Sequence, residues 1–505
     1  MKTKRYFYSC LLLGLVMISC SKDNDSDDDE TVVTSDVVTI SAATAKGTAE
    51  GSAETGANAD DILANSTFSS TVKITFNGTT ATVENAVTGV TVAISGSDVI
   101  VTSTVAEVAY EITGSTTDGM LKIYSDKKYK LTLNGVSIKN NDGPAINIQS
   151  GKRAFIVLSG TNTLEDGATY ATSTEDQKGT FFSEGQLILS GTGSLNITAN
   201  NKHGIAADDY VRVQSGTITI TKAVSDGIHT NDGVYIDGGT LNINASSDGI
   251  EAEEGPIVIN AGTITITAAD DGITASYDTD TTIDPYLVIN GGTITITTTG
   301  TGGEGIESKS TLTINDGTIN IKAVDDGINA GKAIYINGGT IVSYSTTNDG
   351  IDSNGTLTVT GGKTFAIGAK SPEEGFDCDS NTFKITGGLL VGAGGATSSP
   401  TASVSTQASA ILGSGNAGTI YSVLDPDNAE VMTFKSPASF TTLLLSGSKF
   451  SSGKTYKLVT VSSVANATEF NGLYLGGTFS DPVLSSSFTL TSMVTKIGGS
   501  TGGGR

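Results

Sequence analysis

Short runs in which apolar and polar residues alternate make up most of the chain, and glycine-containing corners separate them. The run at 263–266 (TITI) is typical, and alternation with a period of two predicts β-strands. An acidic residue followed by Gly and then Ile or Phe recurs, with its glycine at 227, 249, 272, 305, 327, 350 and 375, in steps of 22, 23, 33, 22, 23 and 25 residues. Each unit of 22 or 23 residues holds three runs. The pattern therefore predicts an all-β fold, a right-handed parallel β-helix solenoid with three strands per coil.

Stacked coils, about 4.8 Å apart, bring equivalent positions into columns along a solenoid. The residue after each repeat glycine is apolar and should point into the core: Ile228, Ile250, Ile273, Ile306, Ile328, Ile351 and Phe376. Cys378 occupies the next inward slot, where the other coils carry small residues, so we expect a buried side chain and not a nucleophile. Polar residues before the glycine that follows the second strand should stack as a structural ladder: Asp237, Asn260, Asn290, Asn315 and Asn337.

The extent of the repeat sets the expected domain boundaries. We expect strands at 60–130 that lead into the solenoid, the solenoid itself at 131–395, and a C-terminal β cap at 396–505. A stretch rich in Ser, Thr, Ala and Gly precedes these strands, so residues 20–59 should form an acidic, flexible tether. Leucine-rich repeats are excluded because their Leu/Asn signature is missing, and β-propeller blades because they need nearly twice the period.

The first residues have the features of a secretion signal. Lys2, Lys4 and Arg5 precede an apolar run that is too short to span a bilayer. The run ends at 17–20 (MISC), which resembles a bacterial lipobox, so residues 1–19 should be a lipoprotein signal peptide; the alternative is an ordinary signal peptide that happens to end near a Cys. A lipobox implies lipidation of Cys20. The acidic run at 21–30 resembles the export tag of Bacteroidetes-type lipoproteins, which implies an anchor in the cell outer membrane, facing the extracellular side.

Charge and cysteine content narrow the choice of partners. Lys and Arg number 29 and Asp and Glu 53, which gives a net charge of −24. Such a chain is a poor partner for nucleic acid or for anionic headgroups, and cations or cation-bridged ligands suit it better. Cys10 lies in the signal and Cys20 takes the lipid, so Cys378 has no partner for a disulfide within one mature chain. We expect a monomer that contacts the membrane through its lipid anchor alone.

Carboxylates recur at two neighbouring positions of the repeat. One column at the corners contains Asp226, Asp248, Asp271, Glu304, Asp326, Asp349 and Glu374. The residue after the inward Ile or Phe should face outward, and this second column contains Glu251, Glu307, Asp352 and Asp377. Hard oxygen ligands without thiolates or paired histidines favour Ca²⁺ over zinc. The alternative for each corner Asp is a turn residue that accepts backbone N–H bonds. Three more candidate calcium ligands, Asp278, Asp280 and Asp284, lie in the insertion that lengthens one step to 33 residues.

Aromatic platforms for sugar rings would have to be tyrosines because the chain contains no Trp. Tyr235 and Tyr335 should point outward from the second strand of their coils. Their alternative role is that of ordinary β-favouring surface residues.

The succession of motifs at 131–388 resembles a bacterial family of carbohydrate-binding parallel β-helix proteins that share their shape with pectate lyases. The resemblance rests on the segments LTLNGVSIKNNDGPAINI and FFSEGQLILSGTGSLNITANNKHGIAADD and on the Asp-Gly-Ile units that follow them. It implies calcium-assisted binding of cellulose or pectin-like polysaccharide. No motif carries the family's ligand residues onto positions of this chain.

Two other functions compete with non-catalytic polysaccharide binding at the cell surface. A surface adhesin or structural solenoid would fit the lipid anchor equally well. A calcium-dependent polysaccharide lyase would need a basic residue to remove a proton. The arginines between 131 and 391, Arg153 and Arg212, are not beside the acidic columns in the repeat register, although Lys309 and Lys332 come closer. The sequence therefore favours a binding protein over an enzyme.

Overall fold

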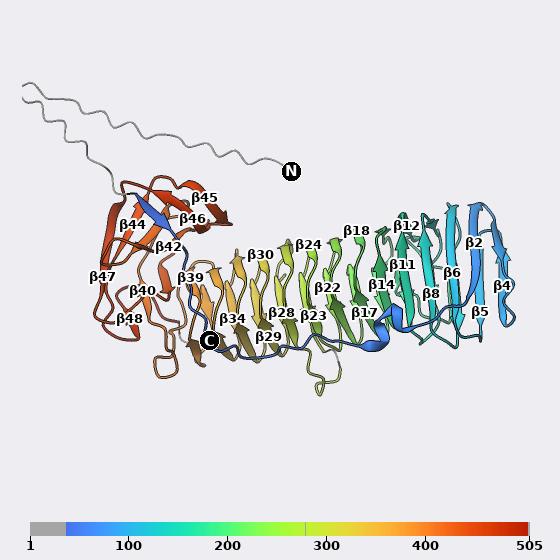
Figure 1. Cartoon of the computed structure of the whole chain (residues 1–505), viewed down its shortest axis with the longest axis horizontal. Coiled ribbons are helices and arrows are strands. Elements are labelled where there is room, and N and C mark those ends of the chain that lie inside the picture. Colours follow the sequence, from blue (N-terminus) through green and yellow to red (C-terminus); the bar gives the residue numbers. More distant parts are fainter. Residues whose placement is uncertain (1–36, 278, 503–505) are drawn as a thin grey trace, which may run out of the picture. The chain divides into compact units, whose positions relative to one another are not determined.

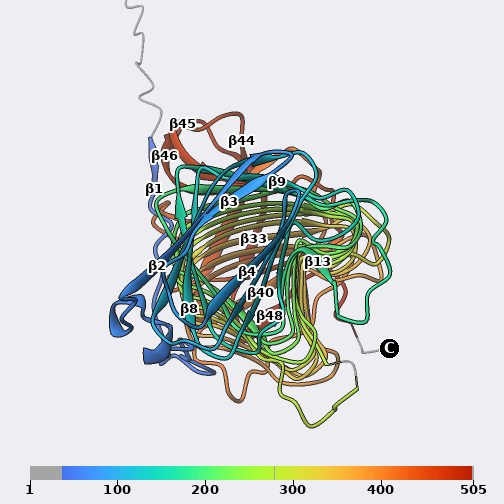
Figure 2. The same ribbon diagram turned by 90° about the vertical axis from the view of Figure 1, so that its right-hand side faces the viewer.

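Parallel coils of three short strands form most of the structure, a computed structural model that describes residues 37–277 and 279–502. One coil consists of β22 (Ile250–Ala252), β23 (Ile257–Ile259) and β24 (Thr263–Ala268). β22 pairs in parallel with β25 (Ile273–Ala275), placing Ile250 beside Ile273. The first strands of about twelve coils line up in one sheet (Figure 1), and strands of successive coils superimpose when viewed along the solenoid (Figure 2). The predicted parallel β-helix is confirmed.

The interior of the solenoid is built from the predicted apolar columns. All seven side chains of the inward Ile/Phe column are completely buried. Burying one such side chain is worth about 1.5–3 kcal/mol, so the column holds consecutive coils together along its whole length. Cys378 is also buried, and burial, the largest influence, raises the pKa of its thiol to about 12. The thiol therefore stays protonated at neutral pH and is a poor nucleophile.

Parallel coiling starts well before residue 131. β2 (Ser70–Gly78) pairs in parallel with β6 (Val108–Thr116), and β5 (Asp98–Ser103) with β7 (Leu121–Ser125). β4 (Val90–Ser95) runs antiparallel to β5 at the end of the first sheet. Residues 70–130 thus form the first coils of the solenoid and close its N-terminal end. They are not separate strands that precede the solenoid. These coils lack the Asp-Gly-Ile corner, which is why the repeat did not reveal them.

The predicted C-terminal β cap is present. β39 (Leu389–Gly394) of the last coil pairs antiparallel with β43 (Thr442–Ser446). A seven-stranded sheet follows, containing β41 (Ile420–Leu424), β42 (Glu430–Lys435) and β46 (Leu473–Phe479). Phe365 from the outer face of the last coils packs edge-on against Phe434 of the cap, with ring centroids 5.7 Å apart. The cap therefore shares a hydrophobic core with the coils next to it.

Residues 41–69, which we call the strap, run along the coils between β1 (Val38–Ile40) and β2 (Figure 1). The predicted asparagine ladder holds the strap in place. Nδ2 of Asn315 donates to Oδ1 of Asn290 across 2.8 Å and to the carbonyl of Ser52 across 2.9 Å. Asn260, Asn290 and Asn337 repeat this pair of bonds, with strap carbonyls at Thr55, Glu54 and Glu50.

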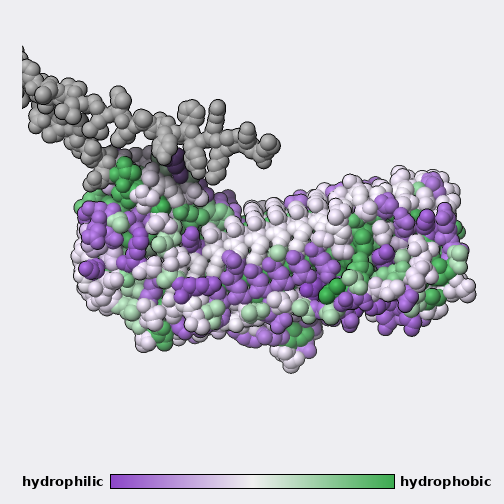
Figure 3. All heavy atoms as spheres, in the orientation of Figure 1, coloured by the Kyte–Doolittle hydropathy of each residue, from purple (hydrophilic) through white to green (hydrophobic). Residues whose placement is uncertain are grey.

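The expectation of a flexible tether at 20–59 is therefore wrong for the residues from 37 onward. Each ladder amide has a second N–H that needs an acceptor, and the strap carbonyls provide it. Residues 20–36 lie outside the described residues. Figure 3 shows a hydrophilic band along the coils on the face where Figure 1 places the strap. In the part of the chain that the structure describes, no helix has the length and apolar character needed to cross a membrane.

Candidate functional site

Each of the five aspartates in the corner column accepts a hydrogen bond from the backbone of the next coil. Oδ1 of Asp248 accepts the backbone N–H of Asp271 across 2.8 Å, and Oδ1 of Asp271 accepts that of Glu304 across 2.8 Å. Asp226, Asp326 and Asp349 accept the backbone N–H of the next coil in the same way. A backbone N–H of the next coil therefore occupies one oxygen of each corner Asp, so these acceptors join neighbouring coils and do not close a turn of their own coil. The other oxygen is left for a further partner.

The second column is less exposed than the alternation predicted. Glu307 is 5% exposed, and Glu251, Asp352 and Asp377 are half-buried. Thr274 on the preceding coil donates its hydroxyl to Oε2 of Glu307 across 3.0 Å. The carboxylates thus line a recessed strip beside the corner column.

Burial and mutual repulsion make it unfavourable to charge these carboxyl groups. Burial, the largest influence, together with neighbouring carboxylates raises the pKa of Asp271 and Asp352 to about 7, of Asp248 and Asp349 to about 8, of Asp326 and Glu374 to about 9, and of Glu304 to about 10. Burial disfavours the charged form and a nearby like charge adds to that effect. Bound cations would remove both penalties.

The two columns together form groups of carboxylates whose ligand atoms lie within 4.8 Å of one another. These groups are Asp226, Asp248 and Glu251; Asp248, Asp270 and Asp271; Asp271, Glu304 and Glu307; and Asp349, Asp352 and Asp377. Asn329 separates the first three groups from the last. Its Nδ2 lies 3.0 Å from Oε1 of Glu304 and 3.4 Å from Oδ2 of Asp326, so an amide donor takes the place that a cation could fill elsewhere. We call the part before Asn329 the long acidic run and the last group the short acidic run.

The donor set fits calcium. Carboxylate oxygens are the preferred ligands of Ca²⁺. Within the described residues, Oε2 of Glu304 and Oε2 of Glu374 are buried without a hydrogen-bond partner, and Glu374 is 4% exposed. Next to the short acidic run lies a cavity of about 470 Å³, whose lining includes Asp349, Glu374, Asp377 and Asp379. The short run therefore offers both ligand atoms and space for a larger molecule.

The insertion loop does not join these groups. Oδ1 of Asp280 accepts the backbone N–H and the hydroxyl of Thr282, 2.9 and 2.6 Å away. Asp284 accepts from Ser310 and forms an ion pair with Lys332 at 3.3 Å. Asp278 lies outside the described residues. Asp280 and Asp284 therefore make local contacts and belong to none of the carboxylate groups found among the described residues, and a calcium site in this loop stays a prediction.

The predicted tyrosine platforms are covered by the strap. A Cβ on Gly51 would lie 2.6 Å from Cδ2 of Tyr335, and one on Gly56 would lie 2.3 Å from Cδ1 of Tyr235. Both rings are half-buried, and the guanidinium of Arg212 lies 5.3 Å from the centre of the Tyr235 ring. Tyr235 and Tyr335 therefore serve as a seat for the strap and cannot stack on a sugar ring while it is in place. No sequence pattern indicates that a segment 179 to 284 residues earlier covers these rings.

The expectation that no histidines are paired is wrong. His203 and His229 stack with ring centroids 4.2 Å apart and planes inclined by 14°. His203 is the corner residue of its coil, because His203-Gly204-Ile205 takes the place of Asp-Gly-Ile; the register sets Ile205 beside Ile228. This in-frame substitution is the signal that could have revealed the pair. Although burial opposes both shifts, hydrogen bonds with the histidines hold the pKa of Asp226 well below its usual range, and hydrogen bonds with Asp226 and Glu251 raise the pKa of His229 to about 10.

The four basic residues that the sequence singled out, Arg153, Arg212, Lys309 and Lys332, all form ion pairs. Nε of Arg153 lies 2.8 Å from Oδ1 of Asp61, and Nε of Arg212 lies 2.6 Å from Oδ2 of Asp237, both beneath the strap. Lys309 is ion-paired with Glu307. Burial lowers the pKa of Lys309, but the hydrogen bond and the charge of Glu307 outweigh burial and raise it. A protonated lysine cannot act as a general base.

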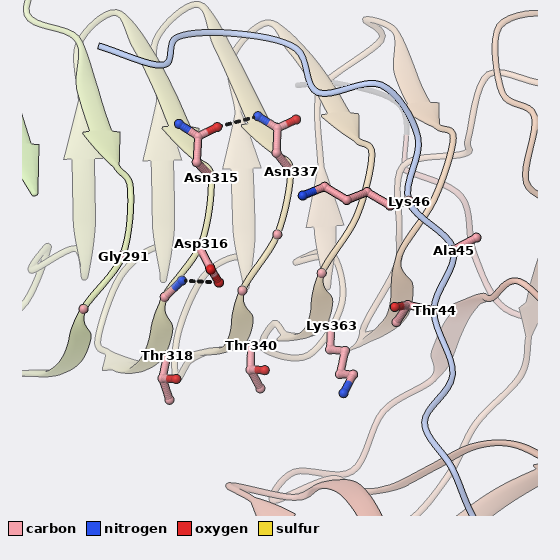
Figure 4. A pocket seen from close by; sticks show the side chains of 15 residues that line it. Thr44, Ala45, Lys46, Gly291, Asn315, Asp316, Thr318, Asn337, Thr340 and Lys363 are labelled. Carbon is pink, nitrogen blue, oxygen red and sulfur yellow. Dashed lines mark hydrogen bonds between the residues drawn. The ribbon is translucent and has the colours of Figure 1, made fainter. Parts of the chain in front are cut away.

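A second cavity, of about 540 Å³, lies between the strap and the glycine corners, away from the acidic columns. Figure 4 shows Lys46 of the strap and Lys363 of β36 (Lys363–Ile367) with Asp316, Thr318 and Thr340 around it. Its lining is mostly glycine and short polar side chains. This second cavity is polar and contains two lysines, so its variants can serve as controls for variants of the acidic cavity.

Fold and site together define a class: a parallel β-helix protein with a recessed acidic face. A family model described as carbohydrate-binding domain-containing protein matches residues 95–350 and 301–422. The first match alone covers more than half of the chain, so the chain belongs to this carbohydrate-binding family, as the resemblance implied. No curated protein gives a significant match. A solved structure described as a polysaccharide lyase-like protein from C. thermocellum, gadolinium derivative, is 28% identical with a TM-score of 0.43, over 48% of this chain and 96% of that chain.

Proposed function

We propose that this protein is a non-catalytic polysaccharide-binding protein that holds Ca²⁺ on its acidic face and, through Ca²⁺, the carboxylates of a pectin-like polysaccharide. The observation that carries the proposal is the arrangement of the acidic columns: the backbone of the next coil uses one oxygen of each corner aspartate and leaves carboxylate groups within 4.8 Å of one another. Membership of a carbohydrate-binding family supports the polysaccharide.

The short acidic run is the part best suited to a bridged sugar. Asp349, Asp352 and Asp377 would hold the ion, and Asp377 also lines the adjoining cavity. Ca²⁺ takes about 6–8 oxygen ligands. Three carboxylates cannot supply that number when one of their oxygens already accepts a backbone N–H. A uronate carboxylate or a hydroxyl of the sugar chain would complete the coordination shell.

The long acidic run gives the same chemistry in repeated form. Asp226, Asp248 and Asp271 follow one another by one coil each, and Glu251 and Glu307 flank them. A polysaccharide that lies along several sites turns many weak contacts into one strong attachment, while short oligosaccharides bind poorly. The proposed ligand is therefore a long chain and not a single sugar.

The cellular location of the protein is proposed from its sequence. Lipidation of Cys20, which lies outside the described residues, would hold a monomeric protein on the extracellular side of the outer membrane. The acidic face would then be available to polysaccharide outside the cell. Cellulose has no carboxylates, so any binding of cellulose should not need calcium.

The test is retention on insoluble pectic acid and on cellulose, each with Ca²⁺ and with EDTA. The wild-type chain should be retained on pectic acid in Ca²⁺, and Asp352→Asn/Asp377→Asn should weaken retention by about tenfold or more, equivalent to about 1.4 kcal/mol. Lys46→Ala/Lys363→Ala, which alters the second cavity, is the matched control and should behave like wild type. Loss of retention in the lysine variant alone would place the sugar in the second cavity and contradict the proposal.

The same samples decide between the alternatives. A product that absorbs in the ultraviolet, formed from pectic acid with a new 4,5-double bond, would establish a lyase. If the protein neither retains nor cleaves any polysaccharide tested, a surface adhesin or structural solenoid becomes the better account.

A further inference from the structure

We propose that His203, Asp226 and His229 form a binding site for a zinc-type divalent metal ion at the N-terminal end of the long acidic run. The chain has two histidines among 505 residues, and the fold brings both rings to the same carboxylate oxygen. The proposal gives Asp226 and Glu251 at this end of the run to the zinc-type ion and leaves the rest of the run to calcium, and it does not depend on polysaccharide binding.

The three side chains come from consecutive coils. His203 opens β16 (His203–Ala207), and Asp226 precedes β19 (Ile228–Thr230), which contains His229. Nδ1 of His203 lies 2.9 Å and Nδ1 of His229 lies 3.1 Å from Oδ2 of Asp226. Oε2 of Glu251 lies 2.8 Å from Nδ1 of His229. Two imidazole nitrogens and two carboxylate oxygens therefore form one chain of contacts in which neighbouring atoms lie 2.8 to 3.1 Å apart.

These atoms have competing hydrogen-bond demands. The backbone N–H of Asp226 donates to Nδ1 of His203 across 3.3 Å, which places a lone pair on that nitrogen. The same nitrogen faces Oδ2 of Asp226, another acceptor. Nδ1 of His229 is shared between Asp226 and Glu251. A metal ion among these atoms would use every lone pair that faces inward.

The outer nitrogen of His229 supports the same assignment. Nε2 lies 3.4 Å from Oε2 of Glu253. Histidines that bind a metal through one nitrogen commonly donate the other N–H to a carboxylate, which fixes the tautomer and the orientation of the ring. Glu253 is thus positioned as an orienting residue, while Glu251 is placed to become a fourth ligand.

Ligand type and spacing favour zinc over calcium here. Imidazole with carboxylate suits Zn²⁺, Co²⁺ and Ni²⁺, whereas Ca²⁺ prefers oxygen alone. Zn–N bonds of about 2.0–2.1 Å in a tetrahedral shell put neighbouring ligand atoms about 3.3 Å apart. The observed separations of 2.9 and 3.1 Å need an outward shift of a few tenths of an ångström, and the stacked rings must tilt so that the in-plane lone pairs of both Nδ1 atoms point at the ion. Asp226 is 3% and His229 9% exposed, so solvent contributes little to the site.

The competing explanation is that protonated histidines serve as internal cations for Asp226 and Glu251. The full chain should be titrated with Zn²⁺ against a chromophoric chelator in excess Ca²⁺, with Cys10→Ser and Cys20→Ser in every protein so that no terminal thiol competes. We expect one tight Zn²⁺ per chain. His203→Asn and His229→Gln should each weaken it by about tenfold or more, whereas Asp352→Asn/Asp377→Asn should leave it unchanged.

A second measurement covers variants that fail to fold. Co²⁺ added to the unsubstituted site should give visible absorption bands and paramagnetically shifted imidazole signals. Absence of Zn²⁺ binding, Zn²⁺ binding unchanged in folded His203→Asn, or a Co²⁺ complex without imidazole signals would overturn the proposal in favour of the protonated pair. None of these results would alter the retention test on pectic acid, so the two proposals can fail separately.

Discussion

The backbone N–H of Asp271 donates to Oδ1 of Asp248 across 2.8 Å, so the corner carboxylate of one coil is fixed to the backbone of the next coil. Such a ladder prevents the carboxylates from moving apart. Two full charges about 5 Å apart repel by about 3 kcal/mol at a protein-surface dielectric of about 20. The carboxylates of the corner column must therefore hold protons or bind cations.

Without calcium, stability should fall as pH rises. The raised pKa values mean that the folded protein binds more protons than the unfolded chain between their ordinary values and about 7 to 10. Stability from this source is complete below about pH 4 and is lost as pH rises through the folded pKa values. Thermal unfolding in EDTA should show a melting temperature several degrees lower at about pH 8.5 than at about pH 5.5.

Millimolar Ca²⁺ should remove most of that difference, because an ion that binds the folded state alone stabilises it by RT ln(1 + [L]/Kd), about 2.7 kcal/mol at a hundredfold excess. Mg²⁺, which demands near-octahedral geometry and releases water reluctantly, is the control and should do less. A melting temperature that ignores EDTA and Ca²⁺ at both pH values would return the column to the role of turn residues.

Much of this architecture could be predicted from the repeat. The Ile250 column, the buried Cys378 and the Asn315 ladder are local consequences of a fixed period, so register alone places them. The strap could not be predicted, because Ser52 and Asn315 are 263 residues apart and nothing in the strap's composition identifies its partner. His203 could have been found, since it occupies the frame of the corner aspartates.

Removing one ladder amide should loosen the strap. Asn315→Ala leaves the carbonyl of Ser52 and Oδ1 of Asn290 without their donor, at a cost of about 1–3 kcal/mol. Hydrogen exchange and limited proteolysis should then increase around Ser52. Asn320→Ala, in β30 (Thr318–Ala323) and outside the ladder, is the matched control. Equal protection of the strap in both variants would show that the ladder does not fasten it.

The fit of the strap on Tyr335 can be tested at Gly51. Gly51 has φ of +80°, and an added Cβ would lie 2.6 Å from the ring, so Gly51→Ala meets both backbone strain of about 1 kcal/mol and a clash. Gly453 has the same φ, but an added Cβ there meets nothing within 4 Å. Denaturant unfolding should therefore show a larger loss of stability for Gly51→Ala than for Gly453→Ala, and similar losses would mean that the contact with Tyr335 contributes little.

Lipidation predicts how the chain divides between cell fractions. Cys20→Ser should block processing or release the protein from the membrane fraction, because a thioether-linked lipid needs the thiol. Cys10→Ser, within the signal, should leave the protein membrane-bound. Immunoblots of fractionated cells provide the measurement. A mature, membrane-bound Cys20→Ser protein would contradict the lipobox assignment.

The break in the acidic columns could not be predicted from the repeat. The repeat placed Asp226 to Glu374 in one column, but the break at Asn329 depends on where a single amide points. The local contacts of Asp280 with Thr282 and of Asp284 with Lys332 could not be predicted from the repeat either. Such side-chain choices are set by three-dimensional neighbours, which a period cannot supply.

The central claim is that calcium joins carboxylates of the protein to carboxylates of the sugar. Affinity electrophoresis of the wild-type chain through gels containing polygalacturonate or its fully methyl-esterified form, at fixed ionic strength, tests it most directly. We predict strong retardation on polygalacturonate in millimolar Ca²⁺, little in EDTA, and little on the ester under either condition. Equal retardation on the ester, or retardation on polygalacturonate that persists in EDTA, would contradict calcium bridging.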